Sequence, residues 1–218
     1  MRQENGESKN EGGRPSQYMY WWRKWKKERG FINSHFEYFF TDYFDIPKIF
    51  YENKKVIDIG CGPRGSLEWT PESTLAVGLD PLVIDYARFG ISNHKALYVN
   101  APAEKIPFVA GSFDCVSAFN SLNYVDDVDE SVEEIRRILK PSGILLFVAE
   151  VNAQPTVDAK HTLSSSILDK FGFDIVERRT YAKPADKGCY DAILDERNLA
   201  PDDGAANMWL IGKLRKRN

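Results

Sequence analysis

Short apolar runs recur along the chain from about position 54, and each is bounded by glycine, proline or polar residues. Seven of these runs have the length and composition typical of strands: KKVIDIG, TLAVGLD, ALYVN, FDCVSAF, GILLFVAE, FDIVERRTY and ANMWLIGKL. Segments with helical periodicity separate several of them, namely PLVIDYARFG, DVDESVEEIRRILK and HTLSSSILDKF. Since strands that alternate with helices pair in parallel and are covered on both faces, the pattern predicts a three-layer α/β sandwich with a mostly parallel, seven-stranded sheet.

The final two runs depart from this alternation. Residues 183–205 separate them and contain no clear helical pattern. We therefore expect the last strand to pair antiparallel with the strand before it. The same long segment is a candidate wall of a binding site, because long connections at strand ends often carry function.

The first 50 residues have a different character. Residues 1–16 are polar and offer almost nothing to bury, so we expect a disordered tail. Residues 17–50 contain two aromatic-rich segments of predicted helix, with Gly30 as the stop between them. We assign residues 51–218 to the α/β core and treat the preceding helices as an N-terminal extension.

Composition narrows the class of protein. The chain has 218 residues, 43% of them hydrophobic, and a net charge of −3, so no global field favours nucleic acid. Cys61, Cys115 and Cys189 form no CxxC pair, which argues against a disulfide framework and against a metal site. The polar N-terminus resembles no signal peptide, and no run reaches the roughly 18 apolar residues of a membrane span. We expect a cytoplasmic protein.

The first strand run ends in a glycine-rich turn. Glycines at positions 60, 62 and 65 form GxGxxG, a pattern shared with dinucleotide-binding enzymes, and glycine permits a tight turn and close approach of a nucleoside. Asp58 precedes this turn and would oppose a pyrophosphate but suit a cationic amino acid group. Only residues 66–73 separate Gly65 from the next strand, too few for the long helix that holds a dinucleotide pyrophosphate. An NAD-dependent oxidoreductase is therefore disfavoured.

Asp80 ends the second strand run, 22 residues after Asp58. An acidic residue at this place accepts hydrogen bonds from the two hydroxyls of a ribose. The alternative is a helix cap immediately before Pro81.

Together, VIDIGCG, VGLD and the segment from AEKIPF to GILLFV resemble class I, Rossmann-like methyltransferases of the small-molecule "type 11" group, over about residues 54–150. The resemblance implies S-adenosylmethionine as cofactor. It assigns the methionine portion to Gly60, Cys61 and Gly62, and the ribose to Asp80 with the adjoining Pro81. It further implies that the adenine lies by Pro102, Ala103 and Glu104, and that residues 120–122, including Asn120 and Leu122, line the methyl-donor cavity.

Two departures from that family affect the assignment. Pro102 stands where the family often has an aspartate for the adenine amino group, so Glu104 or backbone near Ala103 must make this contact. Asn123 and Tyr124 replace a His pair that the family frequently shows, so no catalytic histidine transfers.

The general base has to be sought elsewhere. An oxygen acceptor must lose its proton to a group within hydrogen-bond reach. His161, beyond the fifth strand run, is the first candidate, and Glu150 at the end of that run is the second. The alternatives are a surface histidine and a solvated carboxylate. We interpret Asp126 and Asp127 as helix caps, and His35 and His94 as structural.

The segment WWRKWKK at residues 21–27 permits two interpretations. Basic and aromatic residues together can bind an anionic glycan, nucleic acid or membrane, but an amphipathic helix packed on the domain as a lid explains them as well. The favoured function is methyl transfer to oxygen of a small-molecule or glycan acceptor. A non-catalytic, cofactor-binding module is the alternative. No NPPY-like tetrapeptide follows the fourth strand run, which argues against DNA base methylation, and oligomeric state is left open.

Overall fold

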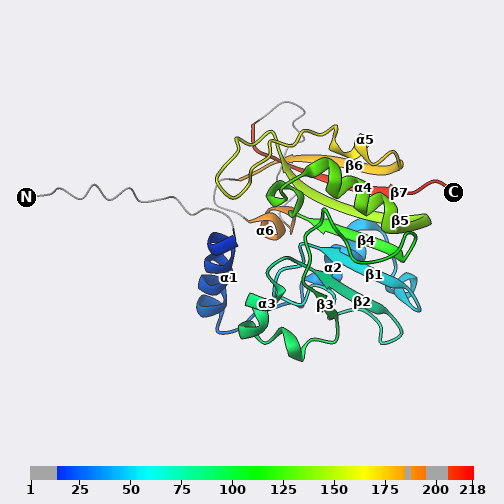
Figure 1. Cartoon of the computed structure of the whole chain (residues 1–218). Helices are drawn as coiled ribbons and strands as arrows, with labels where there is room; N and C mark the ends of the chain where they lie inside the picture. The colour runs from blue at the N-terminus through cyan, green and yellow to red at the C-terminus, as the bar shows by residue number, and fades with distance from the viewer. Residues whose placement is uncertain (1–13, 185–187, 195–205) are drawn as a thin grey trace, which may run out of the picture.

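Seven strands form one mixed sheet in the order β3-β2-β1-β4-β5-β7-β6. The computed structural model describes residues 14–184, 188–194 and 206–218, and Figure 1 shows the arrangement. The strands match the seven predicted runs, and their bounds are β1 Lys55–Ile59, β2 Leu75–Leu79, β3 Leu97–Val99, β4 Phe113–Phe119, β5 Leu139–Val151, β6 Asp174–Ala182 and β7 Met208–Arg215.

Strand direction is as the sequence predicts. The pairs β1–β2, β1–β4, β2–β3 and β4–β5 are parallel, whereas β7 runs antiparallel to both β5 and β6. Because β7 reverses direction between them, β6 runs parallel to β5. The strands β1 to β6 therefore end at the same edge of the sheet, which we call the carboxyl edge, and β7 starts there.

Six α-helices accompany the sheet in the described part of the chain: α1 Arg14–Glu28, α2 Phe36–Phe40, α3 Val83–Tyr86, α4 Val128–Ile138, α5 Ile167–Lys170 and α6 Cys189–Leu194. The expectation that residues 183–205 lack a helix is wrong, because α6 lies inside that segment. Its signal in the sequence is weak since the helix is short and is held by burial of Cys189 and Ala192 against the sheet. Asp127 caps α4, accepting a hydrogen bond from the Glu130 amide at 2.9 Å, as predicted. Asp126 instead pairs with Lys160.

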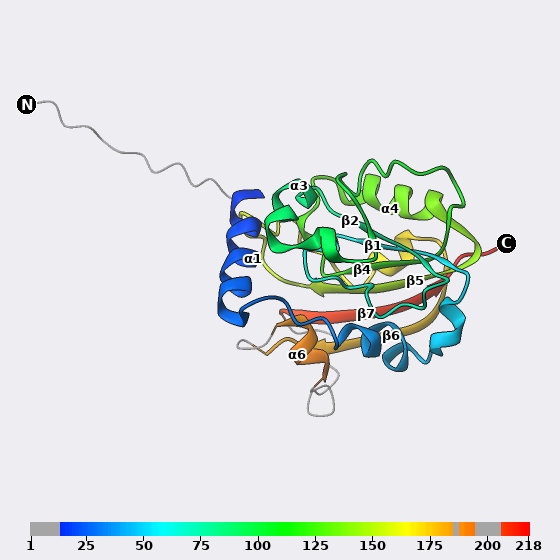
Figure 2. The ribbon, with the colours of Figure 1, turned by 90° about the horizontal axis from the view of Figure 1, so that it is seen from below.

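The helices cover both faces of the sheet, so the predicted three layers are present. On one face α4 and α5 pack against alternate strand residues that include Ile57 and Val116. On the other face α2 and α6 pack against Val56, Cys115 and Leu146. Figure 2 shows α4 on one side of the strands and α6 on the other. This alternation follows from the period of two along a strand, which directs successive side chains to opposite faces.

No helix connects β1 to β2, where residues 60–74 form turns. The short spacing in the sequence predicts this feature. In place of such a helix, α1 lies at the carboxyl edge with α3 beside it, as both Figure 1 and Figure 2 show. Aromatic contacts join α1 to the 3-10 turn that follows α3, including Tyr18 stacked on Phe89 with 5.6 Å between ring centroids.

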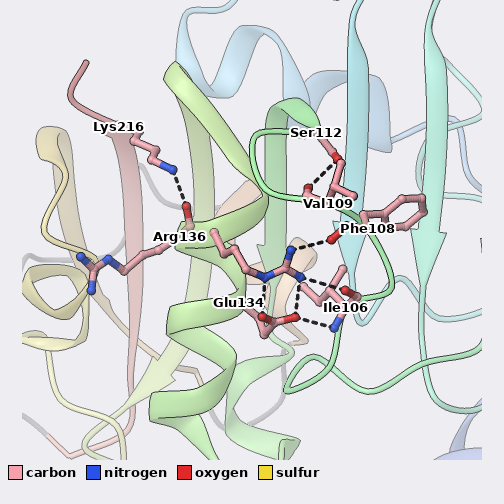
Figure 3. Close-up of polar contacts among 8 residues, drawn as sticks. Ile106, Phe108, Val109, Ser112, Glu134, Arg136 and Lys216 are labelled. Carbon is pink, nitrogen blue, oxygen red and sulfur yellow. Dashed lines mark hydrogen bonds and ion pairs between the residues drawn. The ribbon is translucent and has the colours of Figure 1, made fainter.

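The connection from β3 to β4 also lacks a helix and is fastened to α4 instead. Arg137 forms an ion pair with Glu134 at 2.6 Å and donates to the carbonyls of Phe108 and Ile106. Glu134 also accepts a hydrogen bond from the Ile106 amide at 2.8 Å. Figure 3 shows Glu134 facing Ile106 and Phe108 at the end of α4. These bonds hold the irregular loop in which Ala103 and Glu104 lie.

Residues 1–13 of the predicted tail lie outside the described residues, and α1 begins at Arg14, inside the segment predicted as tail. All three cysteines are free and buried. Among the described residues, no helix combines the length and the apolar character needed to cross a bilayer.

Candidate functional site

The carboxyl edge gathers most of the residues that the sequence singles out. The glycine loop, residues 60–65, follows β1, and Asp80 follows β2. Asn120 and Leu122 follow β4, while Glu150 lies near the end of β5. In an open sheet of this kind, ligands bind outside the carboxyl ends of the strands, so this edge is the candidate site.

The glycine loop requires its glycines. Gly60 and Gly62 have φ angles of 70° and 58°, in the left-handed region that other residues rarely adopt. A Cβ atom at Gly60 would overlap the Cβ of Ser121, and one at Gly62 would lie 2.8 Å from the Trp21 ring. The loop therefore lies directly against the end of β4 on one side and against α1 on the other.

Asp58 is buried beneath this loop. Its two carboxylate oxygens accept hydrogen bonds from the hydroxyls of Ser117, at 2.6 Å, and Ser66, at 2.5 Å. Burial outweighs these bonds and raises the pKa of Asp58 to about 6. Asp58 thus ties the first turn of the loop to β4, a supporting role that the sequence does not reveal.

Asp80 holds the same loop from β2. Its carboxylate accepts hydrogen bonds from the amides of Gly62, at 3.1 Å, and Leu82, at 2.9 Å. Burial raises the pKa of Asp80 to about 6 despite these two bonds. The bond to Leu82 spans Pro81 but does not cap α3, because Leu82 is itself the N-cap of that helix and α3 has no side-chain cap. The bond to Gly62 joins Asp80 to the glycine loop.

Three further residues predicted to contact the cofactor, Cys61, Ala103 and Glu104, already contact other parts of the protein. Burial raises the pKa of the Cys61 thiol well above its usual range, so the thiol is protonated, and its sulfur lies against Gly78. Ala103 belongs to the hydrophobic core. One carboxylate oxygen of Glu104 accepts from the amides of Asp126, at 2.5 Å, and Asp127, at 3.0 Å, which ties the loop between β3 and β4 to the start of α4.

The segment after β4 carries polar atoms that lack protein partners. The side-chain oxygens of Asn120, Ser121 and Asn123 are buried and have no hydrogen-bond partner among the described residues. Leu122 between them is fully buried. Buried polar atoms are almost always hydrogen-bonded in native proteins, so three unsatisfied ones next to the glycine loop fit a site for a polar ligand.

The two candidate bases both have partners. A ring nitrogen of His161 lies 2.9 Å from the carbonyl oxygen of Val125, and Glu150 forms an ion pair with Lys183 at 2.7 Å. Lys183 comes from the end of β6, which places Glu150 at the carboxyl edge as expected. His161 contacts the segment just beyond β4.

His35 is the residue that sequence reasoning misses. Its imidazole lies 5.4 Å from the Tyr190 ring of α6, between centroids, and 4.3 Å from the Phe36 ring. Burial, followed by the positive charge of Arg64, lowers the pKa of His35. The imidazole is therefore neutral near pH 7 and lies beside α6. Nothing in the sequence links positions 35, 64 and 190, so only the fold brings them together.

Tyr124 is a second such residue. Burial raises the pKa of its phenol, so the phenol carries its proton. By contrast, His94 has a structural partner, because its Nδ1 lies 2.7 Å from the hydroxyl of Tyr98. That contact agrees with the structural role expected for His94.

α1 closes over the glycine loop through an arginine of the loop itself. Arg64 forms an ion pair with Glu28 at 2.6 Å and donates to the carbonyl of Ile32 at 2.9 Å. Its guanidinium lies 5.8 Å from the Trp21 ring centroid and 5.1 Å from that of Phe31. These contacts fix the N-terminal segment to the glycine loop.

Comparison with known proteins agrees with this geometry. Residues 57–147 match the family model described as "Methyltransferase domain". A malonyl-[acyl-carrier protein] O-methyltransferase of Enterobacter lignolyticus is 32% identical over 43% of this chain and 38% of its own length. A ubiquinone/menaquinone biosynthesis C-methyltransferase of Shewanella frigidimarina is 28% identical over 56% of this chain and 46% of its own. The matched part spans less than half of each relative.

A solved structure extends the likeness of fold to nearly the whole chain. In the complex between the Haloferax volcanii Trm112 methyltransferase activator and a methyltransferase, the matching chain has a TM-score of 0.62 and 18% identity. The match covers 96% of this chain and 100% of that one. The structural likeness shows a shared fold, and residues 57–147 form a methyltransferase domain of the class I kind, whose cofactor is S-adenosylmethionine. The dinucleotide interpretation of its GxGxxG turn is set aside.

Proposed function

We propose that the chain transfers a methyl group from S-adenosylmethionine to an oxygen atom of a small-molecule or glycan acceptor. The observation that carries this proposal is the set of three buried side-chain oxygens without hydrogen-bond partners, those of Asn120, Ser121 and Asn123, beside the glycine loop. A bound polar cofactor and acceptor would supply the missing hydrogen bonds.

In this proposal, residues 60–62 hold the methionine portion of the cofactor and Asp80 with Pro81 holds the ribose. Ala103 and Glu104 flank the adenine, while Asn120 and Leu122 line the cavity around the methyl group. Asp58 supports the loop and supplies negative charge below the cofactor's ammonium group. When bound, S-adenosylmethionine supplies an electrophilic methyl group on a sulfonium sulfur.

The acceptor pocket is proposed between α1, α6 and the end of β4. Tyr124, Tyr190 and His35 give it flat, largely apolar walls, which suit an aromatic or cyclic acceptor. Such walls exclude water, and holding the acceptor in line with the methyl group provides much of the acceleration. The names of the two relatives include both O- and C-methyl transfer, and neither decides the atom for this chain.

Proton removal from an oxygen acceptor requires a base, and three candidates remain. The carboxylate of Glu150 is already engaged in an ion pair with Lys183. One ring nitrogen of His161 faces the Val125 carbonyl, which leaves the other for catalysis. We add His35, because its neutral imidazole lies beside Tyr190 and near Arg64 of the glycine loop.

The first experiment is titration calorimetry of the full chain with S-adenosylmethionine, S-adenosylhomocysteine and NAD. We expect micromolar affinity for the first two and none for NAD. Methyl transfer from labelled cofactor to a panel of hydroxylated aromatic compounds and glycosides then tests the acceptor class. NAD binding alone would contradict the cofactor assignment, and transfer only to carbon or nitrogen would contradict the proposed atom.

One observation favours a second function, a module that binds the cofactor without turnover. Trp21 lies against Gly62, so α1 covers the loop, and both original base candidates are engaged by protein partners. Cofactor binding with no methyl transfer to any member of the panel would support this alternative.

A further inference from the structure

The outward face of α1 combines large apolar side chains with cations. Met19 and Trp22, three residues apart on this face, are 40% and 39% exposed, whereas Tyr20 lies to one side of it. Arg23, Lys26 and Lys27 are exposed as well and share the same side, since steps of three, four and seven residues return to one face of a helix.

Charge is concentrated on this helix. Between Arg14 and Arg29 the chain has six basic side chains and one acidic one, although its overall net charge is −3. The single acid, Glu28, turns inward to Arg64. Among the described residues, neither Arg23 nor Lys27 has an ion-pair partner. The outward face is thus purely cationic.

The opposite side of α1 is already occupied. Trp21 contacts the glycine loop, and Trp25 and Tyr18 pack with Phe89. The aromatic residues of the outward face are therefore not needed to attach the helix to the domain. Exposed apolar side chains flanked by cations on a fixed helix are typical of an interaction surface.

We propose that the outward face of α1 binds the surface of an anionic lipid bilayer. A helix that lies in the interface inserts its apolar side chains at the level of the headgroups while its lysines and arginines contact anionic lipid. Met19 and Trp22 are the inserting residues, and Arg23, Lys26 and Lys27 make the headgroup contacts.

The geometry favours lipid over nucleic acid as the partner. Single-stranded nucleic acid binds by stacking bases on open aromatic rings. Here the ammonium groups of Lys26 and Lys24 lie 5.4 Å from the ring centroids of Trp22 and Tyr20, and so cover one face of each. At a bilayer interface, such pairs of an aromatic ring and an ammonium group can remain as they are in the structure.

Membrane binding by this face would also affect the acceptor pocket. That effect rests on the proposed function, whereas the membrane binding itself does not. Because the inward face of α1 contacts the glycine loop, docking of the outward face turns the carboxyl edge toward the bilayer. A lipophilic acceptor dissolved in the membrane would then reach the pocket without crossing water.

The test is sedimentation of the full chain with vesicles of phosphatidylcholine, with and without phosphatidylglycerol. We expect binding only to the anionic vesicles, and weaker binding as salt is raised. The double substitution Lys26→Glu with Lys27→Glu should weaken it by about tenfold or more. Lys55→Glu with Lys105→Glu is the matched control, because both lysines are exposed and the change in net charge is identical.

A second variant separates insertion from simple charge attraction. Met19→Gln with Trp22→Gln keeps every cation and should still lower the affinity for anionic vesicles. Circular dichroism of each variant verifies that α1 is folded. Absence of wild-type binding to anionic vesicles, or equal losses in the Lys26/Lys27 and Lys55/Lys105 pairs, would overturn the proposal. Binding of transfer RNA in place of vesicles would assign the face to nucleic acid and overturn it too.

Discussion

Trp21 of α1 lies over Gly62 of the glycine loop so closely that a Cβ atom on the glycine would come within 2.8 Å of the indole ring. The two residues are 41 positions apart, and no regular element joins them directly. This contact makes the N-terminal helix part of the site. Any change that moves α1 must also change access to the loop that we assign to the cofactor.

Gly62→Ala is expected to destabilise the folded protein. The φ angle of 58° costs an alanine about 1 to 3 kcal/mol, and the added methyl group also presses on Trp21. Urea unfolding measures the loss. Adding Trp21→Ala to Gly62→Ala should recover the stability lost to the clash but not the stability lost to backbone strain. Fully additive effects of the two substitutions on the free energy of unfolding would contradict the contact.

Arg64→Gln tests the clamp between the loop and α1. The Arg64 and Glu28 side chains are 8% and 23% exposed, so removing one partner leaves a largely buried charge, at a cost of up to about 3 kcal/mol. Lys48→Gln breaks a matched pair with Glu37 on the surface and should cost about 1 kcal/mol or less. Similar losses for the two variants, measured by urea unfolding, would contradict a clamp.

Asp80→Asn should weaken binding of S-adenosylmethionine. Replacing a carboxylate that accepts ribose hydroxyls loses about 1.5 to 3 kcal/mol per charge-assisted hydrogen bond. Calorimetry measures the affinity, and Asp85→Asn, on the exposed side of α3, provides the control. Undiminished affinity in Asp80→Asn would show that the ribose lies elsewhere.

Asp58 should make the protein less stable as pH rises. Its pKa is raised from 3.8 to about 6, so its contribution to stability is complete below the unfolded value and is lost as pH rises through the folded value. The difference corresponds to about 3 kcal/mol at most. Asp58→Asn removes this contribution.

The measurement for Asp58 is urea unfolding of wild type and variant from about pH 4 to about pH 7. Asp80 titrates with the same sign, so only the difference between the two proteins isolates Asp58. If that difference does not change with pH, Asp58 titrates at an ordinary pKa.

His35→Gln tests the base that the fold reveals. A neutral imidazole is the active form, so the rate falls as pH drops through a pKa below the ordinary 6.5. Loss of a general base typically costs about 10² to 10⁴ in kcat. The variant should lose the acidic limb of the pH–rate profile, whereas His94→Gln should keep it. An unchanged acidic limb in His35→Gln would contradict this role and favour His161 or Glu150 as the base.

The seven strands and the place of the glycine loop could be predicted from the sequence, because both depend on local pattern. Short apolar runs bounded by glycine, proline or polar residues marked the strands, and Gly60, Gly62 and Asp58 marked the turn after β1. The short spacing between Gly65 and β2 excluded a long helix from the connection between β1 and β2. Asp127 was predictable as a cap since capping depends on residues within one turn.

Contacts between distant segments were decided only by the tertiary structure. The pairing of Asp58 with Ser66 and Ser117, and the closeness of His35 to Tyr190, join positions that have no fixed spacing along the chain. The helix α6 escaped prediction because burial against the sheet, not local propensity, stabilises so short a segment. The sequence thus determined which elements form and where the loop turns, whereas packing of the N-terminal helices across the carboxyl edge decided what surrounds the site.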